Sequence, residues 1–428
     1  MRCHFLFSLF GGVGLALGVM LSSPASAQPA APDTSAVIKG YADLALATFE
    51  DALAGGRGLQ KAVDQLLSAP TVETLAAARK AWVDSRPPYL QSEAFRFTNP
   101  IVDEWEGKLN AWPLDEGLID YVANKNPDSE NPLAGANVIA SKSIKINGAD
   151  VDTSKITKEL LAEKLQEAGG IKANVATGFH AIEFLLWGQD LNGTGPGAGN
   201  RPHTDYDTKA CTNGNCDRRA EYLKVVTDLL VEDLAWMVEQ WKADGAARKH
   251  ILSLPPADAL VAIFSGLASL SYGELAGERT KLALLLHDPE EEHDCFSDNT
   301  HNSHYFDALG IENVYLGRYK RLDGKLVAGP SVSDIVRAKS ATVDDGVRQA
   351  LAGTVARMKA LVDKANQGMP FDMLIAEGND EGNRLVQAGV DGLLAQTNAI
   401  RRAVVALDLK NLKVLDSDSL KDPGSVKK

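Results

Sequence analysis

The sequence predicts an all-α protein made of two packed helical bundles, with at most one short β-hairpin. Apolar residues recur at helical spacing along most of the chain, and pairs of Gly or Pro separate the helical stretches. Stretches of comparable size lie on either side of a break at residues 244–256. Because amphipathic helices bury their apolar faces against one another, this pattern favours bundles. No close internal repeat relates the two halves.

The first 27 residues have the composition of a secretory signal peptide. Arg2 precedes an apolar run from Phe5 to Leu21, and Ala25-Ser26-Ala27 forms an A-x-A cleavage site. We therefore expect a mature chain that begins at Gln28, and an exported, periplasmic protein that is soluble after signal-peptide cleavage. The alternative is an uncleaved N-terminal anchor. We expect no later stretch to be long and apolar enough to cross a bilayer.

The expected N-terminal bundle covers residues 28–245. Its predicted helices are Ser35 to Phe49, Leu59 to Leu67, Thr71 to a break at Pro87-Pro88, Tyr89 to Phe97, Leu160 to Trp187 and Ala220 to Lys242. The one plausible hairpin is Val138 to Ile146. A long irregular loop follows at residues 189–217, and loops of this length in compact domains are usually functional or flexible.

The expected C-terminal bundle covers residues 246–415. Its predicted helices are Ala257 to Leu286, Asp344 to Gln367 and Asn379 to Ala406. An acidic loop between the first two contains four histidines, which are His287, His293, His301 and His304. Clustered histidines are typical of metal or haem ligands, and a solvated loop with structural hydrogen bonds is an equal alternative. The polar tail, residues 416–428, is expected to be disordered.

Charge and cysteine content limit the partners and the compartment. The formal net charge is −13, which argues against nucleic acid and anionic membranes as partners. Cys211 and Cys216 flank a polar, turn-rich loop, so a local disulfide is expected in an exported protein. Two thiols that bind a metal are the alternative. Cys295 is then left as a buried, unpaired thiol.

The stretch from Asn174 to Asp190 is the strongest functional candidate. Between Val175 and Trp187 nearly every side chain is apolar, which predicts a buried helix. His180 and Glu183 are three residues apart and so share one face. Because buried ionisable groups are costly when unpaired, a metal ion, a partner side chain or each other must satisfy them. A structural His–Glu hydrogen bond is the alternative to a functional site.

Several motifs resemble one known family. Gly178, His180 and Glu183 match the G-x-H-x-x-E signature of the imelysin-like, or M75 peptidase, family. Segments similar to its iron-regulated, IrpA-like branch are YLQSEAFRF from Tyr89, NAWPLDEGLIDYV from Asn110, GELAGER from Gly273, CFSDNTH from Cys295 and NVYLGRY from Asn313. The resemblance spans nearly the whole mature chain. It implies two related helical bundles that pack together.

The resemblance also implies a set of metal ligands. The family places further carboxylates near the signature helix, and the matching positions are Glu93 and, less directly, Asp115. One imidazole with two or three carboxylates suits Fe, Mn or Zn better than Cu(I), with Ca²⁺ as a further alternative. Outer partners for these carboxylates are Arg96 and Arg279. Glu274 and Glu278 share a helix face and repel each other unless a cation such as Arg279 lies between them.

Three functions remain open from the sequence. The favoured one is a periplasmic protein that binds a metal, iron first and otherwise zinc or calcium, or haem, and works with an inner-membrane or outer-membrane iron transporter. The second is an M75 metallopeptidase. Against it, the sequence has no H-E-x-x-H motif, and Phe184 follows Glu183 where an inverted motif requires His. The third is a metal-free interaction protein with a structural His–Glu pair.

Overall fold

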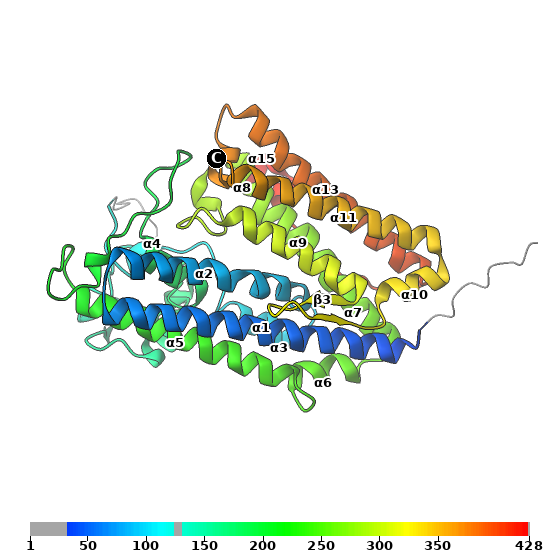
Figure 1. The fold of residues 1–428 in the computed structure, drawn as a ribbon, viewed down its shortest axis with the longest axis horizontal. Coiled ribbons are helices and arrows are strands. Elements are labelled where there is room, and N and C mark those ends of the chain that lie inside the picture. The colour runs from blue at the N-terminus through cyan, green and yellow to red at the C-terminus, as the bar shows by residue number, and fades with distance from the viewer. Residues whose placement is uncertain (1–31, 124–130, 427–428) are drawn as a thin grey trace, which may run out of the picture. The chain divides into compact units, whose positions relative to one another are not determined.

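The computed structural model describes residues 32–123 and 131–426, and the predicted signal peptide with its cleavage site lies outside them (Figure 1). Within these ranges the all-α class is confirmed. Helices dominate, and the described strands form two small two-stranded sheets. The described residues belong to one compact unit, and the larger apolar core takes side chains from both sides of residue 245. The predicted boundary between two bundles stays a prediction.

Three long helices form the first layer: α1 (Thr34–Ser68), α2 (Val72–Ser92) and α5 (Cys216–Trp241). Helix α1 contacts both α2 and α5 (Figure 1). It runs through Gly55-Gly56, where we predicted a break, because these glycines allow close packing: a Cβ atom on Gly56 would lie 2.7 Å from the Leu234 side chain. Helix α2 likewise continues through Pro87-Pro88 to Ser92. Tertiary packing thus keeps both segments helical although Gly and Pro disfavour a helix locally.

A second group of helices contains α9 (Thr300–Leu316), α11 (Ala341–Ala365), α13 (Asp380–Ala406) and the π-helical η6 (Leu270–Lys281). Helix α11 contacts α9 and α13, and α13 contacts η6. A smaller apolar core lies among them, with Met358, Phe371 and Leu393 fully buried. Helix α9 also contacts α2, which joins the two groups of helices.

The remaining helical elements are shorter and mostly connect these long helices. They are η1 (Glu93–Phe95), α3 (Pro100–Glu106), η2 (Glu116–Leu118), η3 (Leu160–Leu165), η4 (Ala168–Gly170), α4 (Gly178–Trp187), η5 (His203–Asp205), α6 (Ala246–Ser253), α7 (Pro256–Ser269), α8 (Leu282–Leu286), η7 (Pro289–Glu291), α10 (Val332–Lys339), α12 (Phe371–Ile375), α14 (Asp418–Lys421) and α15 (Pro423–Val426).

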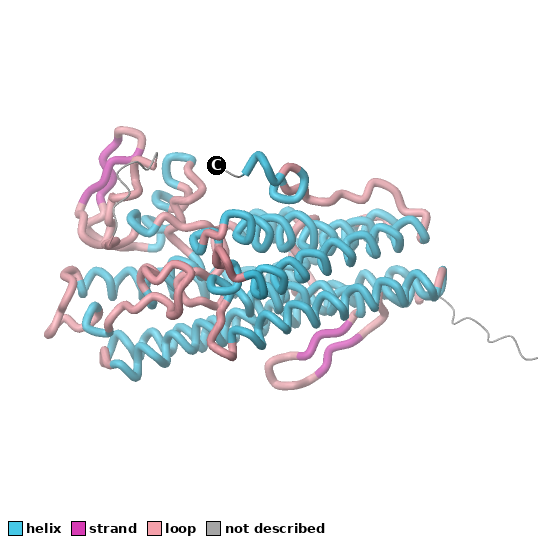
Figure 2. Tube along the Cα trace, turned by 90° about the horizontal axis from the view of Figure 1, so that it is seen from above, coloured by secondary structure: helices cyan, strands magenta, loops and turns pink. Residues whose placement is uncertain are grey.

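The described residues contain two β-hairpins, where at most one was predicted (Figure 2). In the first, β1 (Ser143–Ile146) pairs antiparallel with β2 (Ala149–Asp152), so the hairpin lies later than predicted. Its turn, Asn147-Gly148, has positive φ at both residues, as tight hairpin turns require. In the second, β3 (Arg318–Lys320) pairs with β4 (Leu326–Ala328). The Asp-Gly pair at residues 323–324 is the signal that could have predicted it.

The long loop at residues 189–217 is tied to the core. Cys211 and Cys216 form a disulfide with Cα atoms 5.9 Å apart, and Cys295 is free. Arg201 is buried and lies 2.7 Å from the Asp120 carboxylate. Arg219 of α5 lies 2.6 Å from the same carboxylate, so buried ion pairs hold this loop against α5.

Two expectations about the second half need correction. The tail after Asp416 is not disordered over its described part, because α14 and α15 form there and the Ser419 hydroxyl donates to the Gly277 carbonyl at 2.9 Å. A later stretch also passes as a membrane span by length and composition. It is Pro256–Leu286, a continuous helical stretch of 31 residues, and 78% of its apolar window is buried inside the structure.

Candidate metal centre

Helix α4 is held by a contact that requires glycine at its first residue. Gly178 has φ of +81°, and a Cβ atom there would lie 2.3 Å from the Leu109 carbonyl oxygen. The Phe179 backbone N–H donates to that same carbonyl at 2.7 Å. Any side chain at residue 178 would therefore displace the start of the helix. Since all ten residues of α4 are buried, its position fixes the side chains that it carries.

His180 and Glu183 contact each other inside this buried helix. The Nδ1 atom of His180 lies 3.0 Å from Oε2 of Glu183. The other oxygen, Oε1, accepts from the Ser297 backbone N–H at 3.0 Å and from the Ser297 hydroxyl at 2.6 Å. Burial, and then the nearby Asp294 carboxylate, raise the pKa of Glu183 well above its ordinary value. Nε2 of His180 has no hydrogen-bond partner.

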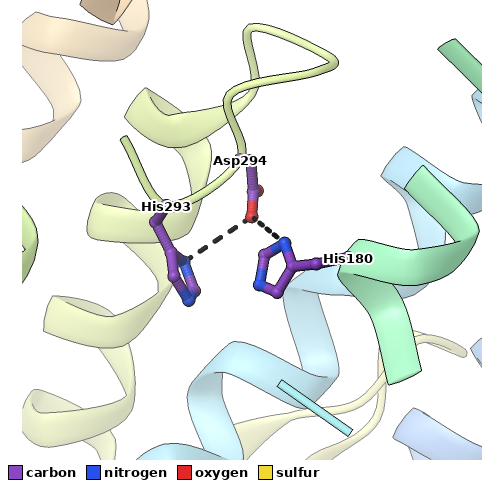
Figure 3. Close-up of side chains that lie close together, drawn as sticks. All are labelled: His180, His293 and Asp294. Atoms are coloured by element: carbon purple, nitrogen blue, oxygen red, sulfur yellow. Dashed lines mark ion pairs between the residues drawn. The ribbon is translucent and has the colours of Figure 1, made fainter. Parts of the chain in front are cut away.

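Residues from the loop before α9 complete the group. In the described part of the chain, His180, His293 and Asp294 form a group whose potential ligand atoms all lie within 4.8 Å of one another (Figure 3). Oδ1 of Asp294 lies 3.9 Å from Nδ1 of His180 and 3.6 Å from Nδ1 of His293. The two imidazole rings are 4.8 Å apart between centroids. All three side chains are at most 1% exposed.

Asp294 remains charged in this buried position because several groups support it. Arg86 of α2 lies 2.9 Å from Oδ1, while Asn299 donates to Oδ2 at 3.0 Å and Ser303 donates to the same oxygen. Burial acts to raise the pKa of Asp294, but Arg86, followed by His180 and these donors, holds it below its ordinary value. The guanidinium of Arg86 also lies 4.8 Å from the ring centre of Phe179, so α4 packs directly on it.

Both histidines of the group are neutral at ordinary pH. Burial, and then the charge of Arg86, lower the pKa of His180 to about 3. Burial, and then the charge of Arg279, lower the pKa of His293 well below its ordinary value, and neither of its ring nitrogens has a hydrogen-bond partner. Neutral imidazole is the form that ligates metals. Two imidazoles and one carboxylate are also the donor set of many non-haem Fe(II) and Zn²⁺ sites, so these residues fit such an ion.

The structure places the other predicted ligands differently. Glu93 lies in η1, where its carboxylate is 2.8 Å from Arg279. Asp115 is half-buried and accepts from the Asn131 side chain at 2.8 Å. Among the described residues, the group of ligand atoms around His180 includes neither carboxylate. Their assignment as ligands stays a prediction, and the contacts of both are made elsewhere.

Arg279 lies at the centre of a buried ion-pair network, which we call the Arg279 network. Its guanidinium is 2.8 Å from Glu274, 2.8 Å from Glu93 and 2.9 Å from Asp307. Arg96 extends the network and is 3.1 Å from Glu106. The full network is Arg96, Arg279, Glu93, Glu106, Glu274 and Asp307. Arg279 thus pairs with Glu274 but with Glu93 and Asp307 in place of the expected Glu278. Glu278 is half-buried, and burial raises its pKa.

The sequence alone did not identify His293 and Asp294 as the partners of His180. His293 was noticed only as one of four clustered histidines, and Asp294 and Arg86 were not singled out. The loop is not a solvated one, since His293, His301 and His304 are buried. His304 packs edge-on against Phe371, with centroids 4.9 Å apart. The signal available was a histidine and an aspartate side by side immediately before the family-like segment that begins at Cys295.

Known proteins resemble this chain over most of its length. The family model for imelysin, peptidase M75, matches residues 45–400. A protein named iron-regulated protein A from Synechococcus elongatus is 31% identical over 130 residues, which cover 30% of this chain and 36% of that protein. This chain thus spans about a third of that relative.

Two solved structures share the fold. A candidate iron-regulated protein A precursor from Parabacteroides distasonis has a TM-score of 0.63 and 19% identity, with 90% of this chain and 97% of that chain covered. An imelysin-like protein from Psychrobacter arcticum has a TM-score of 0.56 and 14% identity, with 89% and 99% covered. Since the family model covers residues 45–400, the chain belongs to the imelysin, or peptidase M75, family.

Proposed function

We propose that this protein binds a transition metal ion, iron first, through His180, His293 and Asp294, with Glu183 as a fourth, adjacent donor. The observation that carries the proposal is the pair of neutral, buried imidazoles with unpartnered nitrogens that face one charged carboxylate. Unpartnered buried nitrogens are costly, and a metal ion would satisfy them. The iron-related name of the relative supports iron as the ion.

The geometry favours a bare ion over haem. The two rings are 4.8 Å apart, and both histidines are at most 1% exposed, so a macrocycle would need room that packed side chains occupy. Zinc remains a second candidate because the same donors suit it. Together with the predicted export signal, a buried ion site supports a periplasmic protein that works with an iron transporter.

Metallopeptidase activity is the alternative that the family name suggests. A zinc peptidase needs a carboxylate free to activate the metal-bound water. Glu183 is adjacent to the metal ligands, but one of its oxygens contacts His180 and the other accepts two hydrogen bonds from Ser297. These contacts favour binding over catalysis.

Metal titration of the apo protein tests the proposal. We expect Fe(II) and Zn²⁺ to bind wild type, and both His180→Ala and Asp294→Asn to lose binding while circular dichroism shows intact helices. His250→Ala is the matched control, because His250 lies in α6, outside the centre. Unchanged affinity in His180→Ala would overturn the site. Metal-dependent cleavage of unfolded protein chains that disappears in His180→Ala would establish the peptidase instead.

A further inference from the structure

A second group of ionisable side chains lies beside the metal centre and contains only carboxylates. It consists of Glu292, Asp298, Asp372 and Asp190, and we call it the acidic cluster. Glu292 immediately precedes His293, Asp298 follows in the same loop, and Asp372 lies in α12. His287, at the start of the loop, donates from Nδ1 to the Ile375 carbonyl at 2.5 Å, which holds the loop against α12.

Two members of the cluster are buried without partners. Glu292 and Asp372 are each 1% exposed, and neither has a hydrogen-bond partner on either carboxylate oxygen. Asp298 has one further buried oxygen without a partner, and it takes up positive φ of 54°. Five buried carboxylate oxygens are therefore unsatisfied, although buried polar groups are paired in the great majority of native sites.

The carboxylates of the cluster act on one another electrostatically. Burial, and then Asp372, Asp298 and Asp190, raise the pKa of Glu292 well above its ordinary value. Burial, and then Asp372 and Asp190, raise the pKa of Asp298 to about 8. Among the groups that act most on these pKa values none is a Lys or Arg, and the Thr300 hydroxyl alone favours the charged form of Glu292. At neutral pH the cluster therefore lacks a counter-charge among the described side chains that act most on it.

We propose that the acidic cluster binds a hard divalent cation of the calcium class. Carboxylate oxygens are the ligands that Ca²⁺ and Mg²⁺ prefer, and a cation would supply the missing charge and satisfy the unpartnered oxygens. The cluster is wider than the metal centre, because among the described residues only His180, His293 and Asp294 bring three ligand atoms within 4.8 Å. A cation there would therefore reach part of these oxygens through bound water, as Mg²⁺ commonly does in proteins.

This second site differs from the metal centre in its chemistry. The centre offers two imidazole nitrogens, which favour iron or zinc, whereas the cluster offers oxygen alone. The two sites share one loop, in which Glu292 belongs to the cluster while His293 and Asp294 belong to the centre. A hard cation bound by Glu292 would consequently fix the loop that carries two of the three transition-metal ligands.

Calorimetric titration with Ca²⁺ tests the proposal on the full mature chain after chelator treatment. We expect one Ca²⁺ to bind wild type, and Glu292→Gln together with Asp372→Asn to weaken binding at least about tenfold, because charge count sets affinity at such sites. The double variant should fold, since it removes uncompensated charges, and thermal unfolding without calcium checks this. Asp150→Asn with Asp323→Asn removes the same charge from two exposed hairpin positions and should leave calcium binding unchanged.

Two results would overturn the second site. One is the absence of Ca²⁺ binding by wild type, and the other is equal Ca²⁺ affinity in wild type and the cluster double variant. His180→Ala separates the two proposals, because it should lose Fe(II) and keep Ca²⁺. Loss of calcium in His180→Ala with full retention in the cluster double variant would place calcium at the metal centre and contradict the acidic cluster as a site.

Discussion

The Arg279 network and the acidic cluster are both buried groups of carboxylates, and they differ in how their charge is balanced. In the network, two arginines lie among four carboxylates, and Arg279 contacts three of them at 2.8–2.9 Å. In the cluster, the groups that act most on Glu292 and Asp372 include no arginine, and the carboxylate oxygens of both have no hydrogen-bond partner within bonding distance among the described residues. The carboxylates of the network therefore have counter-charges within the chain. The charge of the cluster is balanced only when its carboxylates take up a proton or a cation from solution.

The balance in the network is itself incomplete. Burial raises the pKa of Glu106 to about 7, against the opposing charge of Arg96. Burial also raises the pKa of Asp307 well above its ordinary value, against Arg279. Two arginines thus do not balance the negative charge of four carboxylates. The excess carboxylates are therefore protonated more readily than an exposed acid. The same preference for the protonated form applies to the cluster, where the excess of negative charge is larger because no arginine is present.

The largest effect should follow from the loss of Arg279. Arg279→Met leaves Glu93, Glu274 and Asp307 without their shared cation, and removal of one partner from a buried ion pair typically costs about 3–5 kcal/mol. Urea unfolding at pH 7 measures the change. A loss under about 1 kcal/mol would mean that the network carboxylates are already neutral, and the contrast with the cluster would disappear.

A smaller effect is expected from pH on the chelator-treated protein. The folded pKa values of Asp372 and Asp298, about 6 and about 8, lie above their ordinary values, so the stability linked to them is present at low pH and is lost as pH rises through these values. Between pH 6.5 and 8.5 we expect a decrease of roughly 1–3 kcal/mol.

The cluster double variant, Glu292→Gln with Asp372→Asn, serves as the control for this pH dependence. It should show a shallower decrease and not a flat profile, because Asp298 and the acids of the network still titrate in it. Below pH 6.5 the buried histidines oppose this trend in both proteins. Buried histidines such as His180, with a pKa of about 3, must then take up protons on unfolding. Parallel profiles of wild type and variant above pH 6.5 would show that Glu292 and Asp372 do not contribute to the pH dependence.

The smallest effect is expected at the edge of the network. Arg96 is 18% exposed in its side chain and lies 2.9 Å from Asp103, whose side chain is 49% exposed. Water can solvate part of the negative charge that Arg96 balances. Arg96→Met should therefore lower the free energy of unfolding by about 1–2 kcal/mol, less than Arg279→Met. Urea unfolding of the two variants side by side gives the ranking. An equal loss of unfolding free energy in both variants would show that burial does not determine how much an arginine stabilises this network.

Local patterns were sufficient to predict part of the fold and of the site. The helical class follows from the spacing of apolar residues, and the buried helix α4 follows from an almost continuous apolar stretch. His180 and Glu183 were recognised because they are three residues apart on that helix, and the structure brings them within 3.0 Å. The disulfide of Cys211 and Cys216 is equally local, since only four residues separate the cysteines.

The parts that were not predicted depend on contacts between distant segments. Asp294 contacts Arg86 across 208 residues of sequence, and Ser297 contacts Glu183 across 114. No periodicity or spacing encodes such pairs. The same limit explains the missed continuity of α1 through Gly55-Gly56, because the space that these glycines leave is filled by α2 and α5 and not by their own helix.

The distance along the chain between Arg86 and Asp294 has a consequence for the order of assembly. Synthesis proceeds from the N-terminus, so α2 and α4 are complete long before the loop that carries Asp294 and Ser297. A nascent chain that ends at Leu286 has no carboxylate at residue 294 for Arg86 and no Ser297 hydroxyl for Glu183. Until those residues arrive, the two charged side chains must keep water around them. The contacts of Asp294 and Ser297 with Arg86 and Glu183 therefore form late. They form when the C-terminal helices pack against the N-terminal ones.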